Sequence, residues 1–487
     1  MEGLEELKKL LEECNQSHLL RYWSQLSEDQ KKEFLEKLKN IDFKEAQRMW
    51  EKAHEDLDKS NQLSDDHLSP VDVQVENDTA PDLLEEYRNI GYEAISNNQV
   101  AVIVLAGGQG TRLGMPYPKG MCPTGIPSGK SLFQLQAERL RKLMELVKKK
   151  TGKEGTIYWY IMTSETTHAA TTRFLEQYRY FDLKKDNIRL FKQTQIPCFN
   201  FEGKILLEEK DGVAMTPDGN GGIYKALKDN EIFEDMDKKG IKYVHVHSVD
   251  NILIKVADPV FIGKCIKDNI DCGLKVIKKT DPEEPLGIVV KVKDQVQVVE
   301  YSQIPENTAS LLKSTKTAEE GLFFNAGNIC NHFFTTDFLK KVSTEHADDM
   351  TLHIAKKTVT QIGPDGDKIW SPTPNCIKIE KFIFDVIGFS QNCLVWQIER
   401  SQEFSPIKNS DDTNKDCFFT AAKDLMALHK TWVEKVGSEC QGLGVEVSPL
   451  LSYAGEGLSH LSGKTYEEED ELRAENEEDH FSSDSWD

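Results

Sequence analysis

The residues best suited to chemistry lie in a glycine-rich stretch that carries two cations. The stretch from Leu105 to Gly114 reads LAGGQGTRLG, with Arg112 inside it and Lys119 shortly after it. Glycines let a backbone approach a ligand closely, and exposed N–H groups beside two cations suit a polyanion such as a nucleoside triphosphate. An ordinary strand-to-helix turn needs neither so many glycines nor two cations. The stretch therefore predicts a nucleotide-binding loop.

Two common phosphate loops do not fit the spacing. A dinucleotide fingerprint requires G-x-G-x-x-G, whereas the spacing of Gly108, Gly110 and Gly114 is one residue too long. The stretch 125–131 resembles a Walker A loop but has three spacer residues instead of four. We interpret this second stretch as a near miss in which Ser131 caps the next helix. The predicted nucleotide site therefore belongs to neither class.

A second candidate is the carboxylate of Asp250, which follows the apolar run 243–249. A lone Asp at the end of a strand is usually a helix cap or a turn residue. His245 and His247 share one face of the same strand and could imitate a metal pair. No third ligand is evident, so we interpret both histidines as core residues.

Composition restricts the kinds of partner. The chain has 487 residues, enough for two or three domains, and a formal charge of −22, which argues against nucleic acid and anionic membranes. Mean hydropathy is −0.52, and no apolar run approaches membrane-spanning length. The N-terminus lacks the cationic start and apolar core of a signal peptide. Ten scattered cysteines without a C-x-x-C pair favour reduced thiols and a cytoplasmic location.

Alternating apolar patterns predict an α/β fold with a mostly parallel sheet covered on both faces. Ligands in such folds sit at the carboxyl ends of the strands, where we expect both the glycine-rich loop and Asp250 to lie. Expected strands are 100–105, 157–162, 188–192, 241–247, 272–278, 286–293 and 296–301. Expected helices are 131–149, 165–177, 222–229 and 258–270, with a further helix around 418–433.

Composition and periodicity divide the chain into five segments. These are a helical segment 1–55, a polar linker 56–80, a central domain 81–400, a small C-terminal domain 401–463 and an acidic tail 464–487. From Tyr466 onward the tail holds eleven Asp or Glu against Arg473 alone. We expect it to be disordered, with a partner-binding role left open, and truncation after Gly463 to leave catalysis within about twofold.

The same residues resemble a known family. The stretch 105–114, with PKG at 118–120, is similar to the signature of eukaryotic UDP-N-acetylhexosamine pyrophosphorylases. Related UDP-glucose pyrophosphorylases carry a loop closer to N-G-G-L-G-T-x-M-G, so Ala106 and Arg112 favour the acetylhexosamine branch. The resemblance continues in order through 159–164, 217–224, 249–253, 300–302, 324–328, 378–382, 404–409 and 448–457. It implies a Rossmann-like nucleotidyltransferase sheet as the catalytic domain, with an N-terminal helical segment and a small C-terminal domain.

The resemblance also implies a reaction. UMP passes from UTP to N-acetylglucosamine 1-phosphate by in-line attack, assisted by Mg²⁺ (or Mn²⁺), to give a UDP-N-acetylhexosamine and pyrophosphate. N-acetylgalactosamine 1-phosphate stays open as a second acceptor, and so does a homodimer. The alternatives are a UDP-glucose or broad UDP-sugar pyrophosphorylase, and a catalytically silent homologue that binds nucleotide-sugar.

The site residues implied by the resemblance fall into four groups. Catalytic positions are Arg112, Lys119 and Lys408. Nucleotide-binding positions are Leu105, Ala106, Gly107, Gly108, Lys119, Gln193, Gly219, Asp250 and Lys378. Sugar-binding positions are Asn220, Gly287, Glu300, Tyr301, Asn325, Phe382 and Lys408. The metal ligand is Asp250, because the resemblance reverses its interpretation as a turn residue.

Overall fold

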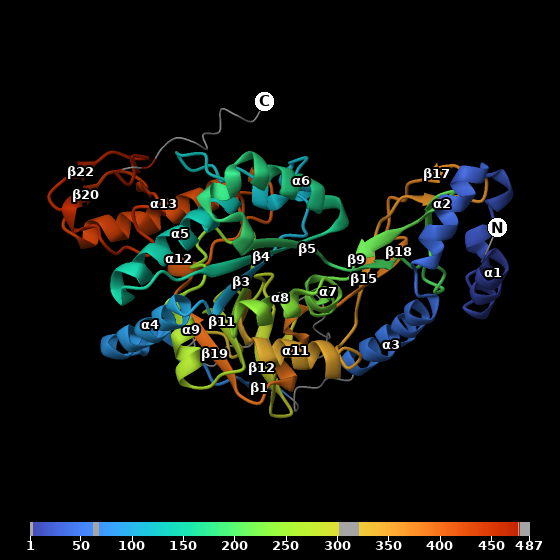
Figure 1. Ribbon diagram of the computed structural model, residues 1–487, viewed down its shortest axis with the longest axis horizontal. Helices are drawn as coiled ribbons and strands as arrows, with labels where there is room; N and C mark the ends of the chain where they lie inside the picture. The colour runs from blue at the N-terminus through green and yellow to red at the C-terminus, as the bar shows by residue number, and fades with distance from the viewer. Residues whose placement is uncertain (1–2, 62–67, 301–320, 476, 478–487) are drawn as a thin grey trace. The chain divides into compact units, whose positions relative to one another are not determined.

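The protein divides into two compact units, each assembled from segments that are far apart in the sequence (Figure 1). The computed structural model describes residues 3–61, 68–300, 321–475 and 477. The small unit comprises Met1–Asp65, Gln193–Ala226 and His346–Val386. The sheet unit comprises Asp66–Lys192, Leu227–Glu345 and Ile387–Asp487. This division replaces the expected one, in which a single domain ran from 81 to 400.

The sheet unit is built on an 11-stranded sheet within the described residues. Its main path, in spatial order, is β2 (Gln74–Val75), β19 (Cys393–Ile398), β11 (Cys272–Lys278), β14 (Ala326–Thr335), β10 (Tyr243–Ser248), β3 (Val100–Leu105), β4 (Ile157–Thr163) and β5 (Ile188–Lys192). All neighbours on this path are parallel except β14, which is antiparallel to β10 and β11. Strands β1 (Leu68–Pro70), β12 (Ile288–Val292) and β13 (Gln295–Val299) add an antiparallel extension. The expected α/β sheet is confirmed.

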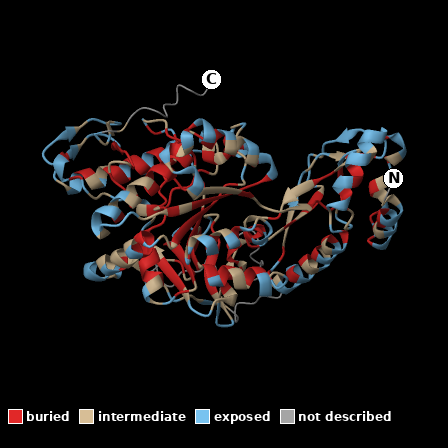
Figure 2. Ribbon diagram, in the orientation of Figure 1, coloured by how far each residue is buried: buried red, intermediate tan, exposed pale blue. Residues whose placement is uncertain are grey.

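Helices accompany these strands. The helices are α4 (Pro81–Ser96), α5 (Leu132–Thr151), α6 (Glu165–Gln177), α7 (Ile223–Asp229), α8 (Ile232–Lys239), α9 (Pro259–Lys267), α11 (Thr336–Glu345), α12 (Arg400–Glu403) and α13 (Phe418–Lys435). Of these, α5, α6, α7, α9 and α13 lie where the pattern predicts helices, whereas α4, α8, α11 and α12 were not predicted. Continuous apolar runs such as β3, every residue of which is buried, belong to the interior of the sheet (Figure 2). None of the helices in the described ranges combines the length and apolarity needed to cross a membrane.

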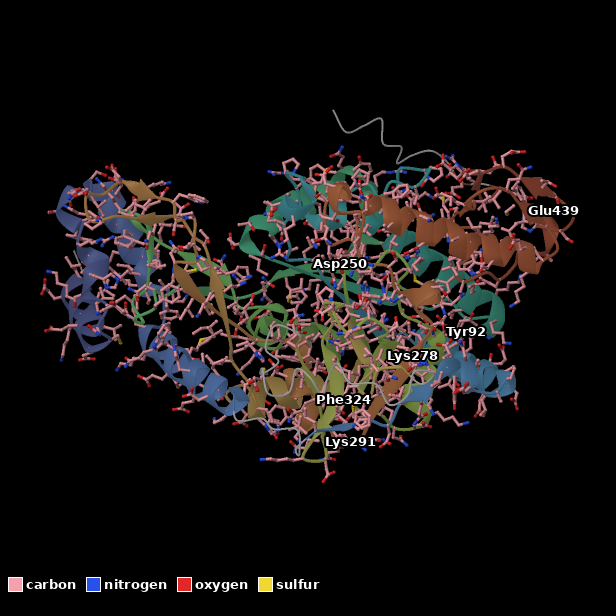
Figure 3. The ribbon with its side chains drawn as sticks, turned by 180° about the vertical axis from the view of Figure 1, so that it is seen from behind. Tyr92, Asp250, Lys278, Lys291, Phe324 and Glu439 are labelled. Atoms are coloured by element: carbon pink, nitrogen blue, oxygen red, sulfur yellow. The ribbon has the colours of Figure 1, made fainter. Side chains whose placement is uncertain are left out.

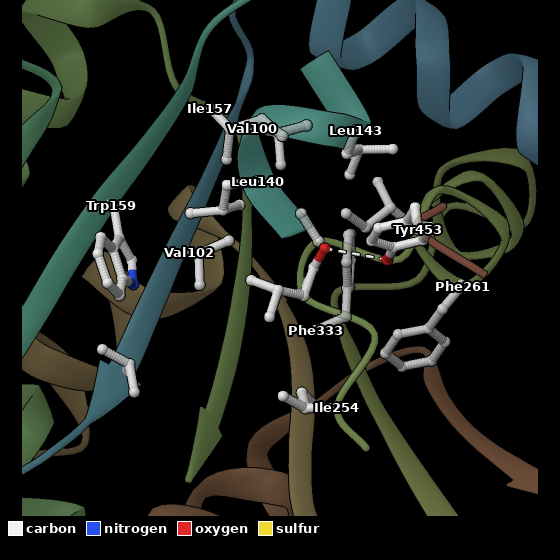
Figure 4. Packing of buried hydrophobic residues seen from close by; sticks show 14 of the residues in the cluster. Val100, Val102, Leu140, Leu143, Ile157, Trp159, Ile254, Phe261, Phe333 and Tyr453 are labelled. Carbon is white, nitrogen blue, oxygen red and sulfur yellow. Dashed lines mark hydrogen bonds between the residues drawn. The ribbon is translucent and has the colours of Figure 1, made fainter. Parts of the chain in front are cut away.

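The core of the sheet unit lies between the strands and these helices. Trp159, Leu140 and Phe261 pack there, together with the other residues drawn in Figure 4. Tyr453 reaches this core from the C-terminal segment, and its hydroxyl donates to the Val256 carbonyl at 3.0 Å. The segment 401–463 is therefore tied to the main core, although it also has a small core of its own beside α13.

In the small unit, N-terminal helices pack against short pairs of antiparallel strands. The helices are α1 (Leu4–Glu13), α2 (Glu28–Lys39), which begins with a Ser27–Gln30 capping box, and α3 (Phe43–Asn61). The strand pairs are β6 (Gln195–Pro197) with β9 (Met215–Pro217), β7 (Leu207–Glu209) with β8 (Gly212–Val213), β15 (His353–Lys357) with β18 (Cys376–Glu380), and β16 (Gln361–Ile362) with β17 (Lys368–Ile369). Phe34 and Leu38 share one core with Phe199 and Ile377. A separate helical segment 1–55 is therefore wrong, because its apolar faces need these strands for burial.

The expected linker and tail also carry structure. Residues 68–75 contain β1 and β2, which pair with β12 and β19. In the tail, β22 (Thr465–Tyr466) pairs with β20 (Glu439–Cys440), and β23 (Glu471–Leu472) pairs with β21 (Glu446–Val447). Disorder from residue 464 onward is therefore wrong for these strands. The prediction of disorder relied on the high charge of these residues, but backbone hydrogen bonds between strands do not depend on side-chain polarity.

Candidate active site

The glycine-rich loop leaves the carboxyl end of β3, as predicted. Leu105 is the last residue of that strand, and Ala106 N–H donates to the Met162 carbonyl at 2.8 Å. A Cβ on Gly110 would lie 2.6 Å from the Tyr117 carbonyl oxygen, so only glycine fits there. Gly114 closes the loop with φ +77°. Gly107 is half-buried and Gly108 is exposed, which leaves their backbone open to a ligand.

Lys119 folds back onto this loop and faces Asp250. The Lys119 N–H donates to the Gly108 carbonyl at 3.3 Å, and the Lys119 Nζ lies 3.6 Å from the Asp250 Oδ2. The Ser248 hydroxyl donates to the Asp250 Oδ1 at 2.7 Å. Burial raises the pKa of Asp250, but Lys119, Lys408 and this hydroxyl outweigh burial and hold it below its usual value. Asp250, labelled in Figure 3, is therefore an ionised carboxylate at the end of β10.

Lys408 reaches the same place on a different segment. The Ile407 N–H donates to the Asp250 carbonyl at 2.9 Å, and the Lys119 ammonium donates to the Ile407 carbonyl at 3.4 Å. Lys408 comes next in the chain, and its charge is one of the two that lower the pKa of Asp250. Two lysines and one carboxylate from three separate segments thus converge beside the glycine-rich loop. Such a cluster can neutralise a polyphosphate while it keeps one oxygen ligand for a metal ion.

Three of the predicted sugar-binding residues lie around the start of β14. A Cβ on Gly287 would lie 2.8 Å from the Glu300 Oε1, so the two residues are close neighbours. The Asn328 N–H donates to the Gly287 carbonyl at 2.8 Å. Asn325 directly precedes β14, whose first residue pairs with Lys278 at the carboxyl end of β11. Tyr301, predicted beside Glu300, lies outside the described residues.

Cys330 connects this group with the charged cluster. The pKa of the Cys330 thiol is raised to about 12, mainly by burial. The negative charges of Asp250 and Glu300 raise this pKa further, and the positive charge of Lys408 lowers it. Since these three charges all act on this thiol, they lie near the same part of the sheet unit. Cys330 has φ +53°, where the pairing of β14 with β11 is irregular. The sequence singled out no role for it, because one cysteine in a strand carries no pattern.

The predicted residues that come from segments 193–226 and 346–386 lie in the small unit. Gly219 has φ +86°, and a Cβ there would overlap the Lys381 carbonyl oxygen. The Asn220 Oδ1 accepts from the Ile383 N–H at 2.9 Å. Because residues 219–220 pack against 381–383, the structure brings Gly219 and Asn220 together with Phe382.

Lys378 and Phe382 have partners of their own in this unit. The Lys378 Nζ lies 2.8 Å from the Glu380 Oε1, and the Phe382 ring centroid lies 4.4 Å from that of His353. Gln193 begins the second segment of the unit, directly before Thr194, whose hydroxyl donates to Asp218. The binding roles of these residues stay predictions.

Arg112 is positioned differently from the two lysines. It lies on a short 3-10 turn, Thr111–Leu113, and is exposed, whereas Lys119 and Lys408 are partly buried. Its predicted role in catalysis stays a prediction.

The two candidate histidines of β10 are buried core residues, as interpreted. The Ala257 N–H donates to the His245 Nδ1 at 3.0 Å, and the His245 Nε2 lies 2.8 Å from the Asn331 Oδ1. Burial lowers the pKa of His245 to about 4 and that of His247 to about 3. Within the described ranges, no three His, Cys, Asp or Glu side chains are grouped to hold a metal ion.

The Walker-like stretch is a helix cap whose lysine is buried in ion pairs. The Gln134 N–H donates to the Ser131 Oγ at 3.2 Å, as predicted for the cap of α5. The Lys130 Nζ lies 2.9 Å from the Glu138 Oε2 and 2.6 Å from the Glu477 Oε1. This lysine is therefore neutralised within the chain.

Comparison with known proteins decides the family. The family described as UTP--glucose-1-phosphate uridylyltransferase matches residues 43–441, which is most of the chain. The chain belongs to this uridylyltransferase family. The family match includes the glycine-rich loop, Lys119, Asp250 and Lys408, so the residues that converge in the sheet unit all lie within it.

Relatives within the uridylyltransferase family carry more specific names. The chain is 42% identical to UDP-N-acetylhexosamine pyrophosphorylase-like protein 1 of Xenopus tropicalis, over 95% of each chain. It is 38% identical to UDP-N-acetylglucosamine pyrophosphorylase of Saccharomyces cerevisiae, over 94% of this chain and 98% of the other. The crystal structure of uridine diphosphate N-acetylglucosamine pyrophosphorylase from Trypanosoma brucei, in complex with inhibitor, superposes with a TM-score of 0.80 at 26% identity, covering 98% of this chain and 99% of the other. The nucleotidyltransferase fold and the resemblance are confirmed.

Proposed function

We propose that this protein transfers UMP from UTP to N-acetylglucosamine 1-phosphate and releases pyrophosphate. The observation that carries the proposal is the convergence of Lys119, Asp250 and Lys408 beside the glycine-rich loop. The choice of sugar in this proposal rests on the names of the relatives, which are 38–42% identical over nearly the whole chain. N-acetylgalactosamine 1-phosphate is the second acceptor that the same proposal allows.

The geometry suits a reaction between two anions. An oxygen of the sugar phosphate attacks the α-phosphorus of UTP, and pyrophosphate leaves from the opposite side. Such a transfer asks for positioning and positive charge more than for covalent catalysis. Lys119 lies on the glycine-rich loop and Lys408 on the segment paired with Asp250, so two cations approach the phosphates from two directions. The exposed backbone at Gly108 leaves room for the nucleotide.

Asp250 fits a magnesium ion as a single carboxylate ligand. Its Oδ1 accepts from Ser248, while its Oδ2 lies 3.6 Å from the Lys119 ammonium, longer than a tight ion pair. Mg²⁺ is commonly held in nucleotide enzymes by one or two carboxylates together with substrate phosphates. Asp250 and phosphate oxygens of UTP would hold Mg²⁺ or Mn²⁺, and the bound ion would offset negative charge at the α-phosphate.

Two alternatives lead to different outcomes. A UDP-glucose or broad UDP-sugar pyrophosphorylase would use glucose 1-phosphate at least as well, but Ala106 and Arg112 favour the acetylhexosamine branch. A silent homologue would bind nucleotide-sugar without turnover. The retained charges of Lys119, Asp250 and Lys408 argue against silence, because removing one group that stabilises a transition state typically lowers turnover by about 10²–10³-fold. We place the protein in the cytoplasm, because its ten cysteines are free thiols.

A coupled assay of pyrophosphate release tests activity against silence. Wild type is incubated with UTP, Mg²⁺ and N-acetylglucosamine 1-phosphate, and the UDP-sugar is identified by mass spectrometry. We expect stoichiometric UDP-N-acetylglucosamine and pyrophosphate, with at least a hundredfold lower kcat in Lys408→Ala. Binding of UDP-N-acetylglucosamine without turnover in the wild type would establish the silent alternative.

A further inference from the structure

The turn that carries Asp250 is paired with the segment that carries Lys408. Asn251 and Pro406 form an antiparallel bridge. The Ile252 N–H donates to the Ser405 carbonyl at 3.1 Å, and the Ile407 N–H donates to the Asp250 carbonyl at 2.9 Å. The position of Lys408 relative to Asp250 therefore depends on how firmly this pairing is held.

The buried side-chain amide of Asn251 stabilises this pairing between the Asp250 turn and the Lys408 segment. Asn251 is 3% exposed. Its Nδ2 donates to the Glu403 carbonyl at 2.6 Å, and its Oδ1 accepts from the Leu253 N–H at 3.2 Å and from the Ser405 N–H at 3.0 Å. Only a side chain with a donor and an acceptor at this length satisfies all three backbone groups.

The far end of the segment is anchored in the core by charge. The Glu403 side chain is fully buried, and its Oε2 lies 2.5 Å from the Lys275 Nζ. Lys275 also pairs with Asp258 at 2.5 Å, and Lys255 lies 3.1 Å from the Glu403 Oε1. A buried group held by several charged partners resists displacement. The amide of Asn251 is thus bonded to a fixed part of the scaffold.

We propose that Asn251 is a positioning residue for the phosphate site, setting where Asp250 and Lys408 stand relative to each other. The inference rests on the proposed function, because it assumes that these two groups act on the triphosphate. Asn251 contacts neither group's charged atoms; it acts through the backbone on both sides of the pairing. Lys119 is coupled to the same arrangement, since its ammonium donates to the Ile407 carbonyl at 3.4 Å.

A kinetic double-mutant cycle tests this role. Asn251→Ala, Lys408→Ala and the double variant are compared in kcat and in UTP affinity measured calorimetrically with Mg²⁺. We expect Asn251→Ala to lower kcat at least tenfold in the wild-type background but less than threefold in the Lys408→Ala background. The second loss is smaller because a variant without Lys408 no longer has that lysine to misplace. Equal fold losses in both backgrounds would overturn the proposal, since a merely structural role is independent of Lys408.

The matched control is Asn375→Ala in the small unit. Asn375 also bridges backbone groups, accepting from Val359 N–H at 2.9 Å and donating to the Val359 carbonyl at 2.8 Å. We expect a similar loss of thermal stability and less than a twofold change in kcat. Asn251→Ser, which keeps one hydrogen-bonding oxygen, replaces Asn251→Ala in the cycle if the latter does not fold.

The cycle also separates the two claims. If the wild type turns over no sugar 1-phosphate, the proposed function fails, and the same cycle read in UTP affinity still decides the role of Asn251. If the wild type is active but the fold losses multiply, only the positioning role fails.

Discussion

The Lys130 ammonium lies 2.6 Å from the Glu477 Oε1, with both side chains under 10% exposed. The Ser448 hydroxyl donates to the same carboxylate oxygen at 2.8 Å, and the Ala474 N–H donates to Oε2 at 3.1 Å. Lys130 ends the loop that links Lys119 to α5. A segment that looks like a solvated tail by composition is therefore docked on the loop that follows a predicted catalytic lysine.

This contact predicts that part of the acidic tail is needed for stability. Truncation after Gly463 removes β22, β23 and Glu477, which is one of the two carboxylates that pair with the buried Lys130. Loss of one partner from a buried ion pair costs up to about 3–5 kcal/mol. We expect the melting temperature to fall by about 3–7 °C, as measured by differential scanning fluorimetry. Truncation after Glu477 is the control and changes little. Equal melting temperatures for the two truncations would show that the docking contributes nothing.

Single substitutions refine this test. Glu477→Gln removes the charge beside Lys130, whereas the exposed Glu475→Gln removes a charge nearby in the chain. We expect thermal destabilisation only for the first. A loss of the same size in both variants would point to net charge instead of the buried ion pair.

Asp250 is predicted to be essential for turnover and not for folding. Asp250→Asn keeps the shape but removes the metal-binding charge and leaves Lys119 and Lys408 without their carboxylate. We expect kcat to fall at least a hundredfold with a change in melting temperature of a few degrees. Near-normal turnover of this variant at ordinary Mg²⁺ would return Asp250 to the role of a turn residue.

The lowered pKa of Asp250 also fixes the sign of its pH dependence. Its carboxylate stays ionised above its folded pKa, which lies below the usual value for Asp, and is lost only as the pH falls through that point. Titration of Asp250 therefore leaves kcat/KM unchanged between pH 5 and pH 8. A wild-type kcat/KM that falls with decreasing pH in this range, with no such fall in Asp250→Glu, would contradict the assignment.

Gly219 is predicted to tolerate no side chain. A Cβ would overlap the Lys381 carbonyl oxygen, in addition to the strain of φ +86°. Gly240 has φ +73° with open space around its Cβ position, so Gly240→Ala measures the strain alone, about 1 kcal/mol. We expect Gly219→Ala to lower the melting temperature clearly more than Gly240→Ala and to raise KM for the substrates. Equal effects of the two substitutions would mean that the close approach to Lys381 is not required.

Buried neutral histidines predict acid sensitivity. Burial lowers the pKa of His332 to about 3, so the folded state stays neutral while the unfolded state binds a proton below about pH 6.5. Stability is therefore lost as the pH falls from about 6.5 towards 3, by about 2 kcal/mol at pH 5 for this residue. We expect His332→Phe to lose less melting temperature between pH 7.5 and pH 5 than the wild type. Substitution of the exposed His460 by Gln is the control. If His332→Phe loses as much melting temperature between pH 7.5 and pH 5 as the wild type, His332 does not contribute to the acid sensitivity.

The sequence predicts those strands whose apolar pattern is continuous. The bounds of β3 and β11 agree with the expectation, because buried strands consist mainly of apolar residues. The bounds of β5 also agree, although only Phe191 of that strand is buried. In contrast, β14 was not predicted, since the buried Asn328, Asn331 and His332 interrupt the pattern. The division into two units was missed as well, because the N-terminal helices bury their apolar faces against strands more than a hundred residues away.

The same limit applies to the site. Lys119, Asp250 and Lys408 could be proposed from motifs, and the structure brings them together. Asn251 and Cys330 could not, because their importance lies in contacts between segments that no spacing along the chain reveals. The pairing of Glu477 with Lys130 was hidden for the same reason.

The preference for an N-acetylated sugar is the central claim, and the most direct test is a ratio of kcat/KM values. Initial rates of pyrophosphate release are measured with UTP, Mg²⁺ and either N-acetylglucosamine 1-phosphate or glucose 1-phosphate. A pocket that hydrogen-bonds an acetamido group leaves its polar groups unpaired with glucose, so we expect at least a hundredfold preference for the N-acetylated substrate. An equal or higher kcat/KM with glucose 1-phosphate would contradict the assignment.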